Sequence, residues 1–336
     1  MNTFITFGVI FLALIVALIL GPIAIWLADR LGLIDDPNSA SHKVHEHLVP
    51  LVGGTILLIT IFIVNFLYGN LRSYPIPAIL LPGLVIFGFG IWDDYKNISP
   101  LWKIIGQLIA TAILIYMGVQ VEIFHQNWLN LAITLLWIVG ITNAYNFVDS
   151  MDGLAIGLAC LASAFFMLIT VESQQPQLSM FSMVMFGAGV SVYYYNAPPA
   201  RIFLGDSGAQ LLGFVLGALA ISYNPQGYPI TSSWYIPILL MGVPIFDTTL
   251  VVLSRLRRGV PIYQAGLDHT YHRLVRLGLS SNRAVLTMHL AAMMMGALAF
   301  IALKLPPLVG NTIFVSVLII AAGCIFLLDT QPKALA

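Results

Sequence analysis

The sequence predicts an all-α, polytopic integral membrane protein. Hydrophobic residues make up 59% of the 336-residue chain, and its mean hydropathy is +0.94. Charged residues account for only 8%, against about 25% in soluble domains. Apolar stretches of about 20 residues, enough for a helix to cross a bilayer, recur along the chain. They lack the alternation typical of barrel strands, so helices are expected to form the spans.

Eleven transmembrane helices are expected from these stretches. They lie at residues 4–28, 51–69, 76–92, 101–119, 128–147, 153–171, 178–195, 207–223, 234–254, 285–303 and 308–328. The first stretch has no basic residue before it and no clear cleavage site, so we expect it to be retained as a helix. Cys160 and Cys324 both fall inside spans, and no disulfide framework is indicated.

The basic residues predict the orientation. Of the 14 lysines and arginines, only Arg72 and Lys304 fall in loops on the side of the N-terminus. Because cytoplasmic loops carry the excess of lysine and arginine, the N-terminus is predicted outside and the C-terminus in the cytoplasm. We expect one membrane-embedded domain, residues 1–336, with an active face formed by cytoplasmic loops 29–50, 93–103, 147–153, 196–206 and 255–284. The net charge is zero, so no nucleic acid partner is expected.

The cytoplasmic face also collects carboxylates, which membrane topology does not require. In "WDDYKN", Asp93 and Asp94 stand side by side at the end of an apolar stretch. Taken alone, this pair is equally consistent with a solvated helix end. Asp247 lies inside a predicted span, after Pro237 and Pro244, which are expected to break the helix. Such a carboxylate is a functional candidate, with a structural arginine pair as an equal alternative.

The segment "NAYNFVDSMDG" carries a stronger signal. Asn143, Asn146, Asp149 and Asp152 recur every three residues. On a helix this spacing forms a polar stripe, which is costly at a membrane boundary unless it binds something. In "RIFLGDSGA", Asp206 lies between two glycines that allow the backbone to approach a ligand, although a helix cap is the alternative.

Two segments gather basic side chains near these acids. "SHKVHEH" contains Lys43 and His45, and "DHTYHRL" contains His269, His272 and Arg273. Lysine, arginine and protonated histidine favour phosphate. Carboxylate oxygens favour Mg²⁺ or Mn²⁺, and no cysteine accompanies the histidines as it would in a typical zinc site. The combination predicts phosphoryl-transfer chemistry at a membrane surface.

In their order along the chain, these segments resemble the motifs of the polyprenyl-phosphate N-acetylhexosamine-1-phosphate transferase superfamily, closest to its N-acetylglucosamine-1-phosphate branch. The resemblance runs from about residue 35 to about residue 285 and rests on "WDDYKN", "NAYNFVDSMDGLA", "RIFLGDSGA" and "PIFDTTLVVLSRLRRGVPIYQAGLDHTYHRLVRLG". It implies an enzyme that needs Mg²⁺ or Mn²⁺ and transfers a sugar 1-phosphate from a UDP-sugar to undecaprenyl or another polyprenyl phosphate. UMP leaves, and synthesis of a cell-envelope polysaccharide begins at the cytoplasmic side of a bacterial inner membrane.

The same resemblance implies roles for individual residues. Asp93, assisted by Asp94, is expected to activate the lipid phosphate, and Asp149 to organise the nucleotide or the metal. The expected metal ligands are Asp206, Asp152 and Asn146. The lipid phosphate is expected to meet Lys43 and His45. The donor is expected to meet Asn143, His269, His272 and Arg273.

Three positions depart from the family pattern. Ser150 stands where glycine is usual, His42 where arginine or lysine is frequent, and Tyr271 where a third histidine is frequent. The changes at His42 and Tyr271 reduce fixed positive charge and leave the identity of the sugar open. The polymer pathway, the lipid chain length and the presence of a homodimer are also open.

Two alternatives remain. Within the superfamily, the rival is the phospho-N-acetylmuramoyl-pentapeptide transferase branch, whose histidine-rich loop reads differently from "DHTYHRL". A secondary transporter is the remote alternative, because it also has many helices with intramembrane acids. Its polar groups should gather near the bilayer midplane, whereas those of this chain gather on one face.

Overall fold

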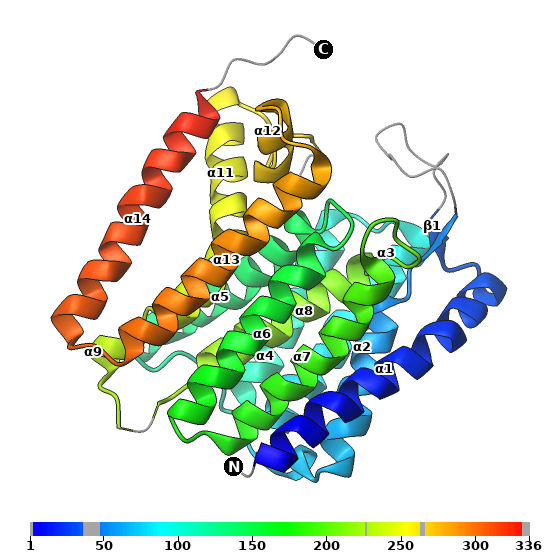
Figure 1. The fold of residues 1–336 in the computed structure, drawn as a ribbon, viewed down its shortest axis with the longest axis horizontal. Helices are drawn as coiled ribbons and strands as arrows, with labels where there is room; N and C mark the ends of the chain where they lie inside the picture. The colour runs from blue at the N-terminus through cyan, green and yellow to red at the C-terminus, as the bar shows by residue number, and fades with distance from the viewer. Residues whose placement is uncertain (1–2, 36–47, 226, 263–265, 331–336) are drawn as a thin grey trace. The chain divides into compact units, whose positions relative to one another are not determined.

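The computed structural model describes residues 3–35, 48–225, 227–262 and 266–330. They form two compact units, residues 1–224 and residues 225–336. Almost all described residues outside short connections are helical, as the composition predicted (Figure 1). The exception is one two-stranded antiparallel pair, β1 (Ile34–Asp35) with β2 (Val49–Pro50).

The first unit is a bundle of membrane-type helices. Its elements are α1 (Thr3–Leu31), α2 (Gly53–Leu67), the 3₁₀ turn η2 (Asn70–Arg72), α3 (Ile76–Lys96), α4 (Pro100–Tyr116), α5 (Asn127–Val148), α6 (Leu154–Glu172), α7 (Pro176–Asn196) and α8 (Gly205–Ser222). Helix α1 packs on α7 and α2, and α6 packs on α7. Proline is the first residue of α4 and of α7. The N–H at this position has no partner within a helix, so proline, which lacks it, costs no hydrogen bond there.

Helix α8 is the centre of this unit. It packs against α2, α3, α5 and α6, and every residue from 207 to 220 is buried. Its glycines and alanines leave space for neighbouring backbones, which is how helices associate where lipid removes the hydrophobic driving force. The two tightest approaches lie at the end of α8 that carries Asp206. A Cβ added to Gly90 of α3 would lie 2.3 Å from Ser207 Cα, and one added to Gly54 of α2 would lie 2.5 Å from Gly208 N.

The second unit contains α9 (Ile230–Ser233), α10 (Ile236–Leu240), α11 (Gly242–Arg258), α12 (Thr270–Arg276), α13 (Ser281–Leu303) and α14 (Pro307–Asp329). Helix α13 packs on α10, α11, α12 and α14, and α14 also contacts α11 (Figure 1). The segment 230–240 and α11 meet at an angle of 68°, so the expected break near Pro237 and Pro244 is present. The polar end of α11 and the short α12 carry the second set of candidate site residues.

The helix lengths agree with a polytopic membrane protein. Among the described residues, eight helices are long and apolar enough to cross a membrane, and the bent pair of 230–240 with α11 makes a ninth. The predicted spans 51–69 and 101–119 correspond to α2 and α4, of 15 and 17 residues. Helices of that size extend about 23 and 26 Å, less than a hydrocarbon core of about 30 Å. The number of eleven crossings and the orientation remain predictions.

Candidate active site

Asp93 and Asp94, the two aspartates of α3, make different contacts. Asp94 accepts the backbone N–H of Asp206 through Oδ1 at 2.6 Å and that of Ser207 through Oδ2 at 3.2 Å. It therefore satisfies the first N–H groups of α8, which have no partner within the helix. Asp93 accepts the N–H of Ile98 at 2.8 Å and is almost fully buried. The two neighbours thus differ in surroundings although the sequence presents them as equals.

Gly205 allows the Asp94 carboxylate to approach the start of α8 and accept its first N–H groups, an arrangement called here the Asp94 cap. Its φ is +71°, in the left-handed region that favours glycine. A Cβ at this position would lie 2.6 Å from Asp94 Oδ2. Both the backbone conformation and the close approach of the carboxylate therefore require glycine immediately before Asp206.

Lys103 connects the buried aspartate with the aspartate of α8. Its Nζ contacts Asp93 Oδ2 and lies 3.1 Å from Asp206 Oδ1. The lysine comes from the first turn of α4, so residues of α3, α4 and α8 meet at one ammonium group. The motifs did not single out Lys103. The available signal was a lysine where the predicted cytoplasmic loop 93–103 meets the apolar span 101–119, and interfacial lysines are too common for that signal to identify a site.

The stripe in "NAYNFVDSMDG" is only partly directed at this cluster. Asn146 donates through Nδ2 to Asp206 Oδ1 at 2.5 Å. Asp152 accepts the backbone N–H of Ala200 at 3.1 Å, so it joins the end of α5 to the loop before α8. Asp149 lies just beyond the last residue of α5. The structure thus brings Asn146 directly to Asp206 and holds Asp152 against backbone.

Negative charge is crowded around Asp149. Burial, followed by the charges of Asp206, Asp94 and Asp152, raises the pKa of the Asp149 carboxyl to about 8. A carboxyl surrounded by other carboxylates resists ionisation. A cation bound among these four groups would offset the repulsion.

The donor atoms of this cluster fit a hard divalent cation by their chemistry. Carboxylate oxygens and an amide, without cysteine or histidine, are the ligand types that Mg²⁺ and Mn²⁺ prefer. Over the ranges that the structure describes, no three His, Cys, Asp or Glu side chains form a ready set of metal ligands. The two carboxylates that meet, those of Asp93 and Asp206, meet on the ammonium of Lys103.

A network of three amides lies next to the cluster. Asn143 donates to Gln107 Oε1 at 2.7 Å, and Gln107 donates to Gln210 Oε1 at 3.1 Å and to Asn143 Oδ1 at 3.3 Å. Gln107 and Gln210 are fully buried. Each member lies three or four residues along its helix from a member of the cluster, namely Lys103 on α4, Asn146 on α5 and Asp206 on α8. The network therefore ties together the three helices that present these groups.

The histidine-rich loop of the second unit is held by a buried carboxylate. Asp247 of α11 lies 2.8 Å from His269 Nδ1 through Oδ2, and its Oδ1 accepts the backbone N–H of Thr270 at 2.6 Å. The rings of His269 and His272 are 6.2 Å apart. Tyr271 is buried and packs edge-on against His272, with ring centroids 5.0 Å apart. Burial, followed by the nearby His269 and Arg276, lowers the pKa of His272 to about 4, so His272 is neutral at pH 7.

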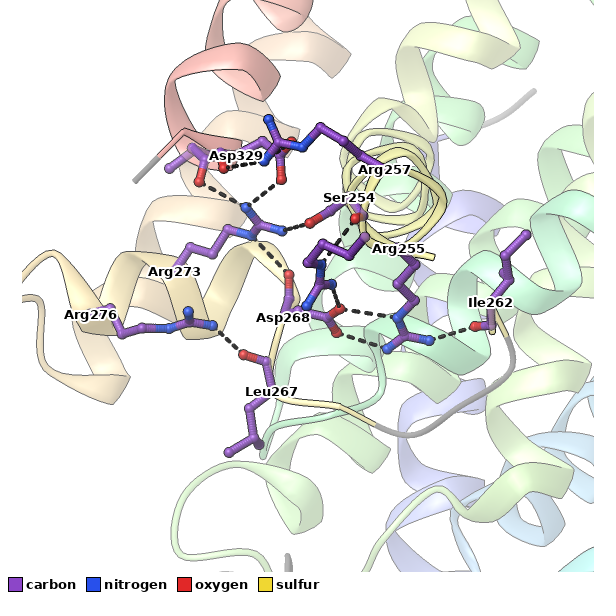
Figure 2. A network of polar contacts seen from close by, with 11 residues as sticks. Ser254, Arg255, Arg257, Ile262, Leu267, Asp268, Arg273, Arg276 and Asp329 are labelled. Atoms are coloured by element: carbon purple, nitrogen blue, oxygen red, sulfur yellow. Dashed lines mark hydrogen bonds and ion pairs between the residues drawn. The ribbon is translucent and has the colours of Figure 1, made fainter. Parts of the chain in front are cut away.

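An arginine network supports the same loop, as Figure 2 shows. Asp268 binds Arg255 through two contacts of 2.8 and 3.0 Å, and it binds Arg258 at 2.5 Å. These arginines, more than the opposing effect of burial, hold the pKa of Asp268 well below its usual range. The network fixes the loop that leads into α12 onto the end of α11.

Arg273 is engaged within this network. Its guanidinium donates to the carbonyl of Asp268 at 2.9 Å, to Ser254 Oγ at 2.8 Å and to the carbonyl of Leu328 at 2.8 Å, and it contacts Asp329 at 3.3 Å (Figure 2). It therefore joins α11, α12 and α14. Arg273 was expected to bind the donor, but in the structure its guanidinium makes contacts within its own unit.

Three residues singled out in the sequence lie outside the described residues. They are Lys43 and His45, expected at the lipid phosphate, and His42, one of the departures from the family pattern.

Comparison with known proteins relates the chain to membrane transferases. Residues 76–224 match the family described as Glycosyl transferase family 4. The chain is 30% identical over 324 residues to a Bacillus subtilis (strain 168) protein named "Probable undecaprenyl-phosphate N-acetylglucosaminyl 1-phosphate transferase", covering 94% of this chain and 88% of that protein. It is 30% identical over 307 residues to the Mycobacterium tuberculosis "Decaprenyl-phosphate N-acetylglucosaminephosphotransferase", covering 80% and 75%.

A third relative is named for a different activity. The chain is 27% identical over 317 residues to the "Phospho-N-acetylmuramoyl-pentapeptide-transferase" of Halalkalibacterium halodurans, covering 86% of this chain and 94% of that protein. The matches to these relatives therefore extend along most of the chain, and the family match includes the carboxylate cluster.

Proposed function

The chain belongs to glycosyl transferase family 4, and from this premise we propose that it transfers N-acetylglucosamine 1-phosphate from UDP-N-acetylglucosamine to undecaprenyl phosphate. One observation carries the proposal: 30% identity along nearly the whole chain to a protein named for this reaction. The convergence of Asp93, Lys103 and Asp206 supports it, because it joins residues of separate motifs in one charged site. The product would be a lipid-linked sugar that starts cell-envelope polysaccharide synthesis.

The reaction exchanges one phosphoanhydride bond for another. An oxygen of the lipid phosphate attacks the phosphorus that carries the sugar, the bond to the α-phosphate breaks, and UMP leaves with the electron pair. The number of phosphoanhydride bonds is unchanged. Catalysis of such a transfer consists mainly of positioning and of stabilising charge.

Asp93 and Lys103 are the proposed groups at the acceptor. Asp93 is the candidate for taking a proton from the lipid phosphate, while Lys103 offers the positive charge next to it. Asp94 acts indirectly, because both of its oxygens fix the start of α8 and hence Asp206. We place Lys43 and His45 at the lipid phosphate as well, on the basis of the motif alone.

The charges also support a divalent cation. Donor and acceptor are both anionic, and they would approach a cluster of five aspartates with one lysine: Asp93, Asp94, Asp149, Asp152, Asp206 and Lys103. Unscreened repulsion between such groups would oppose binding. Mg²⁺ or Mn²⁺, when bound, would neutralise phosphate charge. Asp206 and Asn146 are the proposed ligands, with Asp152 completing the set and Asp149 organising it.

The histidines of the second unit are proposed for the donor. His272 is neutral at pH 7 and would act as a hydrogen-bonding group rather than as a cation. His269 would contact the pyrophosphate of the UDP-sugar, as His272 does in this proposal. Asn143 and Arg273, also expected at the donor, are better assigned to positioning, because Asn143 is bonded to Gln107 and Arg273 to its own unit. The excess of basic residues in one set of loops supports a bacterial cell membrane location with this face toward the cytoplasm.

The test is an assay of the purified protein with a set of donors. It would contain undecaprenyl phosphate, Mg²⁺ and either UDP-N-acetylglucosamine, UDP-N-acetylgalactosamine or UDP-N-acetylmuramoyl-pentapeptide. We expect UMP release and a lipid-linked sugar with UDP-N-acetylglucosamine. Activity confined to the muramoyl-pentapeptide donor would favour the rival branch, for which the 27% identical relative is named. Uptake of intact UDP-sugar into proteoliposomes without UMP release would favour a transporter.

A further inference from the structure

Asp247 is a fully buried carboxylate that the proposed function does not use. It lies in α11, with no exposed surface, six residues beyond the break at Met241. Burying an ionised carboxylate is unfavourable unless charge or hydrogen bonds compensate. Both oxygens are engaged, one by His269 Nδ1 and one by the N–H of Thr270. Its partner is therefore a histidine and a backbone amide, where the sequence left an arginine pair open.

Both contacts of Asp247 fix the position of the His269 side chain. Thr270 is the first residue of α12 and His269 is the residue before it, so the bond to Thr270 fixes the backbone from which the imidazole projects. The bond to Nδ1 fixes the rotation of the ring at 2.8 Å. A carboxylate at Nδ1 selects the state of histidine in which Nδ1 carries a proton. Any contact of His269 with a phosphate then has to be made through Nε2.

The surroundings make Asp247 the charge partner of His269. Among the described residues, Asp268 and His272 also interact electrostatically with His269, and Arg276 acts on His272. Asp268 is already bound by Arg255 and Arg258. His272 and Arg276 provide no negative charge. Asp247 is therefore the carboxylate in contact that can balance a protonated imidazole.

We propose that Asp247 is a positioning residue that orients His269 and balances its charge, so that Nε2 donates a hydrogen bond to the pyrophosphate of the UDP-sugar. The inference rests on the proposed function, since it names the ligand of His269. A serine protease uses a buried aspartate at Nδ1 in a related way, because that aspartate orients the imidazole and stabilises its protonated form. Here the oriented atom would bind phosphate instead of moving a proton from serine.

The decisive variant is Asp247→Asn, which keeps the shape and one acceptor for Thr270. Its amide NH₂ would face Nδ1, so the ring would be neutral with its proton on Nε2, and the hydrogen bond to the pyrophosphate would lose its positive charge. We expect the Kd for UDP, measured in detergent with Mg²⁺, to rise about five- to ten-fold, because a charge-assisted hydrogen bond is about twice as strong as a neutral one. Turnover at saturating donor should fall by a similar factor, while the KM for undecaprenyl phosphate stays within about two-fold.

A double-mutant cycle separates positioning from stability. In the His269→Gln background, adding Asp247→Asn should change UDP affinity by less than about two-fold, because the residue it orients is already gone. Asn311→Leu is the control: this amide also joins parts of the unit, through the carbonyl of Thr231 and the indole of Trp234, and has no role in the proposed site. It should lower the melting temperature without changing UDP affinity.

The outcomes distinguish the two proposals. Wild-type protein that binds UDP but transfers no sugar would overturn the proposed function. The double-mutant cycle could still be measured in that case, because it uses the affinity for UDP. Additive losses in the cycle, or normal UDP affinity of Asp247→Asn, would overturn the positioning role. Failure of the wild-type protein to bind UDP would overturn both. The inference is supported if Asp247→Asn lowers the affinity for UDP only in protein that retains His269.

Discussion

The carboxylate of Asp94 accepts the backbone N–H of Asp206 at 2.6 Å, so one aspartate of the pair holds another carboxylate in place. Asp93, its neighbour in sequence, instead meets the ammonium of Lys103. Adjacent identical residues on α3 therefore have different tasks. This division leads to separate expectations for the residues around the cluster.

Replacing Lys103 should affect the reaction strongly. Lys103→Met keeps the length of the side chain but leaves Asp93 and Asp206 without their shared cation. Removing one partner of a buried pair costs about 3–5 kcal/mol, part of which should appear in turnover as a loss of about 100-fold or more. UMP release measures it. The control is Lys304→Met, an exposed lysine at the end of α13 and outside the predicted active face, which should retain activity within about two-fold. Near-normal turnover of Lys103→Met would remove Lys103 from the site.

Gly205→Ala should damage the site through geometry alone. The new methyl group would face Asp94 Oδ2 at 2.6 Å, and a positive φ costs a non-glycine residue about 1–2 kcal/mol. We expect a lower melting temperature and a loss of UMP release greater than ten-fold. In Gly140→Ala, nothing lies within 4 Å of the added Cβ, and alanine favours a helix by about 1 kcal/mol. If both variants behaved alike, the Asp94 cap would not matter for activity.

Breaking the amide network should lower stability more than substrate affinity. Gln107→Leu leaves Asn143 and Gln210 without their shared partner in a buried place. Each unsatisfied group costs about 1–3 kcal/mol, so the melting temperature in detergent should fall clearly. Adding Gln210→Leu should cost less than the sum of the single changes, because the residues share one network. Gln177→Leu, at an exposed position, serves as the control. Strict additivity would show that the three amides do not act together.

His272 should make the second unit sensitive to acid. Its pKa is lowered from 6.5 to about 4 in the folded protein, so below about pH 6.5 the unfolded chain binds the proton more readily. Stability is therefore reduced as pH falls from about 6.5 to about 4 and is unaffected by this group above that window. His272→Gln removes this contribution. Melting temperatures at pH 7.5, 6 and 5 should fall less steeply for the variant, and parallel curves would contradict the expectation.

Removal of divalent metal should abolish transfer. Anionic donor and acceptor would otherwise face the aspartates whose mutual repulsion raises the pKa of Asp149. UMP release should cease with EDTA and return with Mg²⁺ or Mn²⁺ in excess. Ca²⁺, which accepts looser geometry and longer bonds, provides a comparison for selectivity. Full activity of metal-stripped protein in chelator would exclude a required cation.

Local chemistry was enough for much of this molecule. Hydropathy alone predicts helices long enough to span a bilayer, because the cost of unpaired backbone in lipid leaves few other structures. The order of the motifs led to the family, and a relative matched over 94% of the chain confirms it. The break near Pro237 and Pro244 also followed from residue type, since proline cannot continue the hydrogen bonds of a helix.

Tertiary structure decided which polar residues meet. The sequence by itself determined the all-helical membrane class, the family and the collection of acids at one set of helix ends. It could not pair Asp94 with the start of α8, assign Lys103 to the cluster or pair Asp247 with His269. Those relations depend on how closely helices pack, and at α3 and α8 that distance is determined by the missing side chain of Gly90 against Ser207. Spacing along a chain specifies the face of one helix, whereas contacts between helices require the packed bundle.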